Sequence, residues 1–172
     1  MLKLMGAVLL LMSASAAGYL AAWKYAERPR QIRRLRLALS LLETDISYGF
    51  RPLDEACRLI ARRESEPVAS LFNRCADNLQ QLDGASTFQC WQQAVEEIWP
   101  QTAMKQPEKE ILLDLGKTLG ASDRADQQHH LMLAMSNLRV EENEAREEQS
   151  RYEKMCKSLG VLSGLLLVIL MY

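Results

Sequence analysis

The sequence predicts an all-α protein, in which a helical bundle of about six helices lies between a transmembrane helix and a hydrophobic tail. Three observations support this prediction. Residues 4–23 carry no charge, apolar residues then recur at three- and four-residue steps, and the chain ends on an apolar run at residues 159–172. We therefore expect an anchor at residues 1–26, a bundle at residues 27–157 and a second membrane segment at residues 158–172.

Residues 4–23 form the first candidate span, because a helix of this length rises ~30 Å and matches the hydrocarbon thickness of a bilayer. Only Lys3 precedes this stretch. Six cations follow it closely: Lys24, Arg28, Arg30, Arg33, Arg34 and Arg36. Since Lys and Arg concentrate on the cytoplasmic side of a span, the chain after the first span is expected in the cytoplasm.

Two alternatives apply to the same stretch. It could be a cleaved signal peptide, with residues 4–12 as the apolar region and Ala14-Ser15-Ala16 as the cleavage site. The arginines argue against cleavage, because several cations just past the cut would have to cross the membrane. The second alternative is a helix buried in a soluble protein.

The composition limits the remaining functions. Lys and Arg number 21 against 22 Asp and Glu, so a net charge of -1 gives no general attraction to nucleic acid. The four cysteines form no C-x-x-C pair. In a cytoplasmic domain they are expected to be reduced, without a disulfide and without structural zinc.

Helical periodicity and breakers divide the bundle. Pro29 is suited to the first turn of a helix that ends near Gly49, with Ile32, Leu35, Leu39, Leu42 and Ile46 as its apolar stripe. A second helix follows Arg51-Pro52, and a third starts after the break at residues 65–67. A fourth is capped by Ser86 or Thr87 and closes at Pro100.

A fifth helix starts near Pro107 and ends at Gly120. Ser122 or Asp123 then caps a last segment, which contains no Pro and has no Gly before Gly160. The sequence therefore permits one helix from about Asp123 to the terminus, ~75 Å long at 1.5 Å per residue.

The apolar tail, residues 159–172, is the second candidate span. As a helix it rises only ~21 Å, so snorkelling of Lys157 and local thinning of the bilayer would have to complete it. A partly inserted or partner-covered tail is the alternative. Arg151, Lys154 and Lys157 precede the tail, which again places the bundle in the cytoplasm with both spans leading outward.

Charges near the two spans suggest a two-helix stalk. Arg33, Arg34 and Arg36 follow the first span by about the distance at which Glu147 and Glu148 precede the second. Exposed pairs of this kind contribute ~0–1 kcal/mol each, which can set register but cannot hold a fold. The alternatives are two unrelated solvated faces, or arginines that contact anionic headgroups.

Catalytic and cofactor signals are weak. Gly116-Lys117-Thr118 ends like a P-loop, but position 111 is Ile in a predicted helix where a glycine is needed. His129 and His130 point about 100° apart on a helix, and the pairing of Asp126 with His130 is typical of an exposed helix face. We expect no enzyme, metal site or cofactor. An enzyme using these three residues ranks last among the hypotheses.

Three stretches resemble the stage III sporulation protein AB family of endospore-forming bacteria: the opening MLKLMGAVLL, residues 27–56 and residues 151–172. That family is similar to the cytoplasmic domain of the inner-membrane platform proteins of type II secretion and type IV pilus systems. The platform pattern includes a G-E-x-x-G turn, which here runs from Gly116 to Gly120 with Lys117 in place of the acidic residue. No internal repeat is found, so one copy of the domain is expected.

The resemblance implies a non-enzymatic scaffold in the mother-cell membrane facing the forespore, with most of the chain cytoplasmic. Such a scaffold would help build a secretion-like channel complex required for endospore formation, next to a cytoplasmic ATPase, stage III sporulation protein AA. The alternative is a membrane-tethered adaptor or regulator that binds a soluble partner through a helical face. The sequence leaves a homo-oligomer open.

Overall fold

The computed structural model describes the backbone of residues 2–48, 51–81, 84, 86–120 and 123–171, and it describes side chains within residues 25–152 and at residues 154 and 155. Within this part, the chain folds into six α-helices and one short 3-10 helix, with no strand. They are α1 (Leu2–Tyr48), α2 (Leu53–Arg63), α3 (Val68–Gln80), α4 (Thr87–Ile98), η1 (Trp99–Gln101), α5 (Gln106–Thr118) and α6 (Arg124–Met171).

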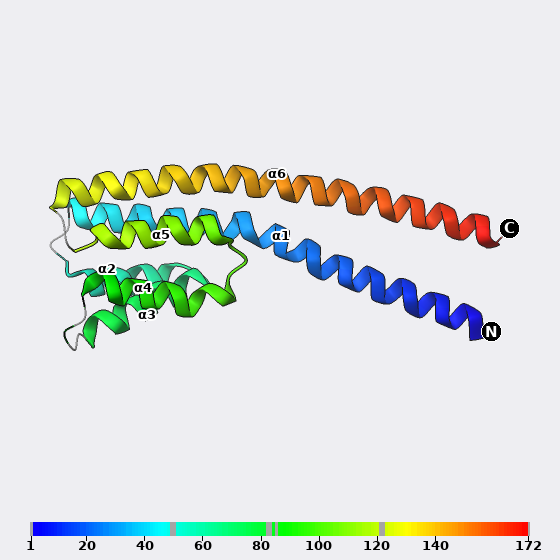
Figure 1. The fold of residues 1–172 in the computed structure, drawn as a ribbon, viewed down its shortest axis with the longest axis horizontal. Helices are drawn as coiled ribbons and strands as arrows, with labels where there is room; N and C mark the ends of the chain where they lie inside the picture. Colours follow the sequence, from blue (N-terminus) through cyan, green and yellow to red (C-terminus); the bar gives the residue numbers. More distant parts are fainter. Residues whose placement is uncertain (1, 49–50, 82–83, 85, 121–122, 172) are drawn as a thin grey trace.

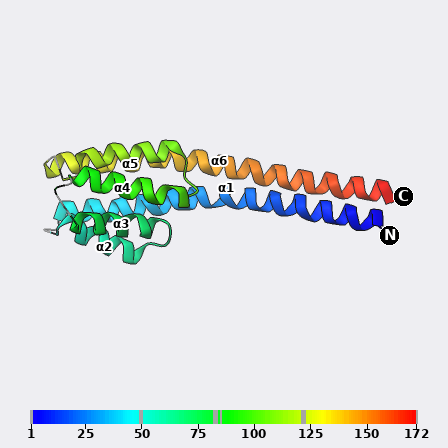
Figure 2. The same cartoon turned by 60° about the horizontal axis from the view of Figure 1, so that its bottom comes forward.

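Two long helices form the frame of the molecule. α1 and α6 lie side by side in opposite directions, and both continue well beyond the bundle so that the two chain ends lie at the same end of the structure (Figures 1 and 2). The four shorter helices gather at the other end. α5 packs along α6 and α4, while α2 and α3 pair with each other and contact α1.

The predicted apolar stripes make the core. Ile32, Leu35, Leu39 and Leu42 on α1 are fully buried, as predicted for this segment. Across the bundle, the rings of Phe72 and Trp91 meet edge to face with centroids 5.9 Å apart, a favoured geometry for an aromatic pair. Burial of these side chains is the main source of the bundle's stability.

Helix ends follow the predicted signals. Ser86 caps α4, since its hydroxyl accepts a hydrogen bond from the Gln89 N–H at 3.2 Å. Asp123 accepts from the Asp126 N–H at 2.8 Å and begins α6, which confirms the prediction of one last helix. α5 ends at Thr118, and Gly120 follows with φ +76°, a conformation that favours glycine.

The predicted start of a helix at Pro29 is wrong. Pro29 lies inside α1, which runs without a break from Leu2 to Tyr48. A proline in this position removes one backbone hydrogen bond. The loss is tolerated here because α1 is held on both sides of Pro29 by contacts of Tyr25, Arg28 and Ile32 with the rest of the molecule.

The predicted membrane spans lie largely outside the described side chains. Across the residues that could be searched, no helix combines the length and apolar character that a membrane span requires. The backbone of residues 4–23 is helical as part of α1, and that of residues 159–171 is helical as part of α6. The predicted boundaries at residues 26 and 157 fall within these two continuous helices.

A close approach of α4 and α5 depends on Gly116. A Cβ atom at this position would lie 2.3 Å from Cδ1 of Trp91, far inside van der Waals contact. The indole cannot move away freely, because its Nε1–H donates to the Leu112 carbonyl at 2.7 Å. A Cβ atom at Gly120 would likewise lie 2.9 Å from Oγ1 of Thr87. Both glycines therefore allow α4 to pack against α5 and the turn after it.

We expect Gly116→Ala to lower the free energy of unfolding by about 1–3 kcal/mol, because the added methyl group must displace the Trp91 ring. Lys117→Ala is the matched control, since the Lys117 side chain is 62% exposed and its loss should cost less than about 0.5 kcal/mol. Urea unfolding followed by tryptophan fluorescence measures both variants. Equal stability of the two variants would contradict the packing argument.

Candidate functional site

A cluster of charged side chains lies where α1 and α6 leave the bundle, at the neck of the molecule. Its centre is Arg28, whose side chain is only 4% exposed. The guanidinium reaches three carboxylates: Glu108 on α5 at 2.6 Å, Glu148 on α6 at 2.9 Å and Glu141 on α6 at 3.2 Å. We call Arg28 and these three glutamates the neck cluster. One cation thus joins three helices.

Glu108 is the most buried member of the neck cluster, with no exposed surface. One carboxylate oxygen, Oε1, accepts from Nε of Arg28 at 2.9 Å, and the other accepts from the Lys105 backbone N–H at 2.8 Å. The second bond belongs to the first turn of α5. Because a buried carboxylate is costly unless it is paired and hydrogen-bonded, Glu108 depends on both contacts.

Glu148 joins the neck cluster to a second cation. Its two carboxylate oxygens accept from Nζ of Lys105 at 2.8 and 2.7 Å. Hydrogen bonds from Lys105, together with the positive charges of Lys105 and Arg28, hold the pKa of Glu148 below its ordinary value despite partial burial. Glu148 is therefore favoured in its charged form, bound between α1 and the start of α5.

Glu141 experiences the opposite effect. Burial raises its pKa, and repulsion from Glu108, Glu144 and Glu148 adds to the rise, while the charge of Arg28 opposes it. Glu108 pairs closely with Arg28, and Glu148 pairs with both Arg28 and Lys105, whereas the only cation paired with Glu141 among the described residues is Arg28, at 3.2 Å. Ionised Glu141 weakens the fold as the pH rises from its unfolded pKa through its folded pKa.

Further contacts between α1 and α6 lie on either side of the neck cluster. Towards the chain ends, the rings of Tyr25 and Tyr152 stack with centroids 3.7 Å apart, and the Tyr25 hydroxyl donates to the Tyr152 hydroxyl at 2.8 Å. Towards the bundle, Arg36 donates to Glu142 at 2.6 Å. Glu142 is only 5% exposed and also accepts from Arg146. These pairs fix the antiparallel register of the two helices.

The ion pairs that the predicted stalk residues form differ from the predicted pairs. Among the described side chains, no ion pair joins Arg33 or Arg34 to Glu147 or Glu148. Arg36 pairs with Glu142, and Glu148 pairs with Arg28 and Lys105. Arg33 and Glu147 are exposed, and Arg34 lies near the Glu64 carboxyl. Arg36 and Glu148 thus each join α1 to α6, but with partners other than the predicted ones.

The remaining topology residues divide into surface and neck positions. Arg30 is 64% exposed and pairs with Glu27 at 3.0 Å. The side chain of Lys24 lies outside the described residues. Sequence reasoning assigned Arg28 only to membrane topology and did not identify it as the centre of a buried network. The spacing of Glu141 and Glu148, seven residues apart on one helix face, was the signal that could have indicated a shared partner.

The residues that gave weak catalytic signals in the sequence do not form a reactive arrangement in the described part of the chain. His130 lies 3.6 Å from Asp126, with both side chains partly exposed, and no group of three metal-ligating side chains is present in the residues searched. Lys117 pairs with Asp114 at 2.7 Å on the surface of α5. Cys57 and Cys75 are buried free thiols with sulfur atoms 4.0 Å apart.

We expect Glu148→Gln to lower the free energy of unfolding by about 1 kcal/mol at pH 7, because partly exposed pairs contribute this much. The folded pKa of Glu148 is depressed, so its contribution is complete above the unfolded pKa and is lost as the pH falls through the folded value. Denaturant unfolding should show the difference between the two proteins shrinking as the pH falls below the ordinary pKa of a glutamate, about 4.3.

Glu147→Gln is the matched control for this prediction, since its carboxylate is exposed and forms no ion pair with the described residues. It should have the stability of the parent protein at every pH. A difference between Glu148→Gln and the parent that persists unchanged at acid pH would show that charge is not the cause.

Known proteins resemble this chain in both sequence and fold. The family model described as stage III sporulation protein AB matches residues 3–172. The stage III sporulation protein AB of Bacillus subtilis (strain 168) is 44% identical over 172 residues, which cover 99% of this chain and 99% of the relative. A solved structure of stage III sporulation protein AB (SpoIIIAB) has a TM-score of 0.69 at 40% identity, covering 73% of this chain and 98% of its own.

These relatives are named as a sporulation protein and not as an enzyme, in agreement with the sequence-based prediction. The family resemblance seen in the terminal segments and in residues 27–56 is confirmed over almost the whole chain. This chain belongs to the stage III sporulation protein AB family, a family of sporulation proteins.

Proposed function

We propose that this protein is a membrane-anchored structural scaffold of a secretion-like channel complex between the mother cell and the forespore. In this proposal, the first and last segments span the mother-cell membrane facing the forespore, and the bundle lies in the cytoplasm. The cytoplasmic ATPase, stage III sporulation protein AA, and the channel subunits are its partners. The family membership and the likeness to secretion platform proteins support this assignment.

The observation that carries the proposal is the neck cluster together with the two long helices. Arg28 holds α1 beside α6 and α5, and the two helices continue from the neck in the same direction (Figures 1 and 2). Because residues 4–23 and 159–172 are uncharged, two helical extensions that leave the bundle at the same end are suited to enter one bilayer together. The neck would then fix the bundle at a constant height and orientation.

The cations near the neck support the proposed orientation. Arg30 is exposed on α1 soon after the first apolar segment. There it can contact anionic headgroups of the inner leaflet, where a cation near the surface contributes about 1 kcal/mol. We retain Lys24, Arg28, Arg30, Arg33, Arg34 and Arg36 as the residues that set topology. The turn from Gly116 to Gly120 has a packing role that is compatible with its place in the platform pattern.

A second candidate function is a membrane-tethered adaptor that binds a soluble partner through one helical face. Three apolar side chains on α6 support it: Met132, Leu133 and Val140 are 55%, 49% and 56% exposed. Exposed apolar side chains gathered on one helix are typical of interaction surfaces. This candidate needs the same anchors but no channel complex.

The test is purification of the tagged full chain from sporulating cells. We expect the chain to remain in membranes after alkaline carbonate washing, since two spans anchor it. After extraction in mild detergent, the ATPase and at least one channel subunit should copurify with it. A tagged vegetative membrane protein of similar abundance is the control.

Two results would contradict the scaffold. Recovery of the chain from the soluble fraction would remove the membrane anchors and with them both candidate functions. Recovery from membranes with a soluble partner, but without the ATPase or any channel subunit, would instead support the adaptor.

A further inference from the structure

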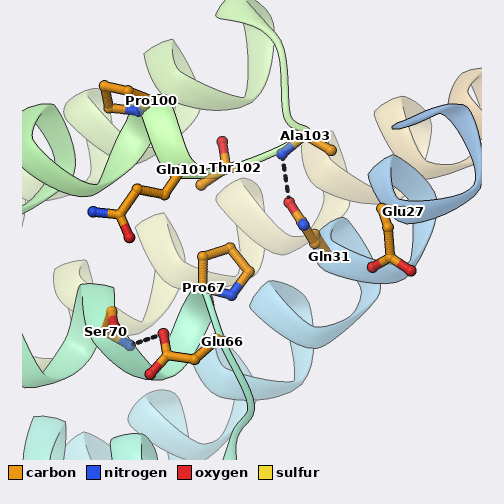
Figure 3. A pocket seen from close by; sticks show the side chains of 9 residues that line it. All are labelled: Glu27, Gln31, Glu66, Pro67, Ser70, Pro100, Gln101, Thr102 and Ala103. Atoms are coloured by element: carbon orange, nitrogen blue, oxygen red, sulfur yellow. Dashed lines mark hydrogen bonds between the residues drawn. The ribbon is translucent and has the colours of Figure 1, made fainter. Parts of the chain in front are cut away.

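A cavity of about 490 Å³ opens beside the neck, next to α1 (Figure 3). It lies between α1, the turn before α3 and the connection from η1 to α5. Its walls include Glu27 and Gln31 of α1, Glu66 and Pro67 before α3, and Thr102 after η1. None of the contacts described for the neck cluster uses this space.

The cavity wall presents polar atoms that the fold does not use. Gln31 is 7% exposed, and its Oε1 accepts a hydrogen bond from the Ala103 N–H at 2.7 Å. This bond fixes the amide and leaves Nε2 without a partner among the described residues. Glu66 accepts from the Ser70 N–H at 3.3 Å through Oε2, and its Oε1 has no partner in the described part of the chain. Figure 3 shows both hydrogen bonds at the cavity.

These groups suit a cationic side chain carried by a polypeptide. A carboxylate oxygen accepts charge-assisted hydrogen bonds from a guanidinium, and the amide of Gln31 can donate to a backbone carbonyl of the same segment. Anionic headgroups are disfavoured by the charges of Glu27 and Glu66. Since Arg30 already pairs with Glu27 at 3.0 Å, Glu66 is the carboxylate open to an incoming cation.

The same chain carries a cation at the level of the cavity along α1. Arg33 is exposed on α1 and forms no ion pair with any described residue. Along the helix it lies ~3 Å from the level of Gln31, and around the helix it lies about 200° away. Leu37, one turn further, is 54% exposed and adds apolar surface to the same face. Arg33 and the cavity therefore lie on opposite sides of α1 at one level.

We propose that the cavity beside the neck receives Arg33 from a second copy of this chain. This inference rests on the proposed function, because a shared membrane holds all copies at one height and in one orientation. The cavity of one copy then faces Arg33 of its neighbour without tilting. Since donor and acceptor surfaces differ, the contact is heterologous, and repetition within the membrane plane leads to an arc or a closed ring.

The test uses two differently tagged copies of the full chain, coexpressed and extracted from membranes in mild detergent. When both copies carry Arg33→Glu, or both carry Glu66→Arg, their co-isolation should fall at least about tenfold, because like charges then meet in the cavity. Mixing a copy carrying Arg33→Glu with a copy carrying Glu66→Arg should restore the contact, since opposite charges then meet whichever of the two copies contributes position 33.

Glu96→Arg is the matched control, because Glu96 is an exposed carboxylate on α4 outside the cavity lining. It should leave co-isolation unchanged. The proposal would be overturned if the mixed copies did not recover co-isolation. It would also be overturned if two copies carrying the same substitution, Arg33→Glu or Glu66→Arg, retained full co-isolation. The mixed experiment also guards against misfolding, because a misfolded variant could not be rescued by the opposite charge on its neighbour.

A photoreactive residue in place of Thr102 identifies the occupant directly. We expect a covalent dimer of this chain. Adducts with a different protein or with phospholipid, and none with a second copy, would overturn the proposal. The same extract reports on the proposed function separately: ATPase and channel subunits without a second copy defeat only this inference, whereas a second copy without those subunits defeats the scaffold.

Discussion

The buried guanidinium of Arg28 is the interaction on which the arrangement of the long helices depends. It is surrounded by carboxylates from α5 and α6, and the most buried of them, Glu108, has no exposed surface. A buried charge of either sign is costly alone, so Arg28 and Glu108 require each other. Because Glu108 also closes the first turn of α5, the same contact orders that helix and joins it to both long helices.

Two kinds of interaction stabilise different parts of the molecule. Within the bundle, apolar side chains from α1 to α6 form one continuous core, and the glycines at 116 and 120 let α4 approach α5 closely. At the neck, polar pairs replace the apolar core and set the register: Tyr25 with Tyr152, Arg28 with Glu148 and Arg36 with Glu142. A neck built from directional contacts specifies one alignment, whereas apolar surfaces alone would tolerate sliding.

This division explains how a small bundle could act as a scaffold. A fixed neck sets the position of the bundle relative to the apolar ends of α1 and α6. The surfaces beside the neck then lie at a defined distance from those ends. The cavity at Gln31 and Glu66 and the exposed face at Arg33 both lie at this level. Neither arrangement needs a reactive group.

Much of the fold could be predicted from the sequence because local patterns determine it. Apolar periodicity identified the buried faces of the helices, and Ser86, Asp123 and Gly120 marked helix ends through backbone chemistry that acts within a few residues. Pro29 misled the prediction, because a proline is equally compatible with a first turn and with a helix held by tertiary contacts. Local sequence cannot distinguish the two.

The site was predicted less well, for a physical reason. Distances from the two apolar segments predicted that the charged segments of α1 and α6 face each other. Pairing within those segments depends on the rotation of each helix and on α5, which lies about 80 residues from Arg28 in sequence. The pairing of Arg28 with Glu108 is a tertiary property. No spacing within α1 indicates that one of its five arginines, Arg28, is buried while Arg33 remains on the surface.

The most direct measurement of the central claim is the free energy of unfolding of Arg28→Met compared with Arg30→Met, in the detergent-solubilised full chain. Arg28→Met leaves Glu108 buried without its cation, so a loss of about 3–5 kcal/mol is predicted. Arg30 is 64% exposed, and its replacement should cost less than about 1 kcal/mol. Equal stability of the two variants would contradict the account, because Arg28 would then be one more surface cation.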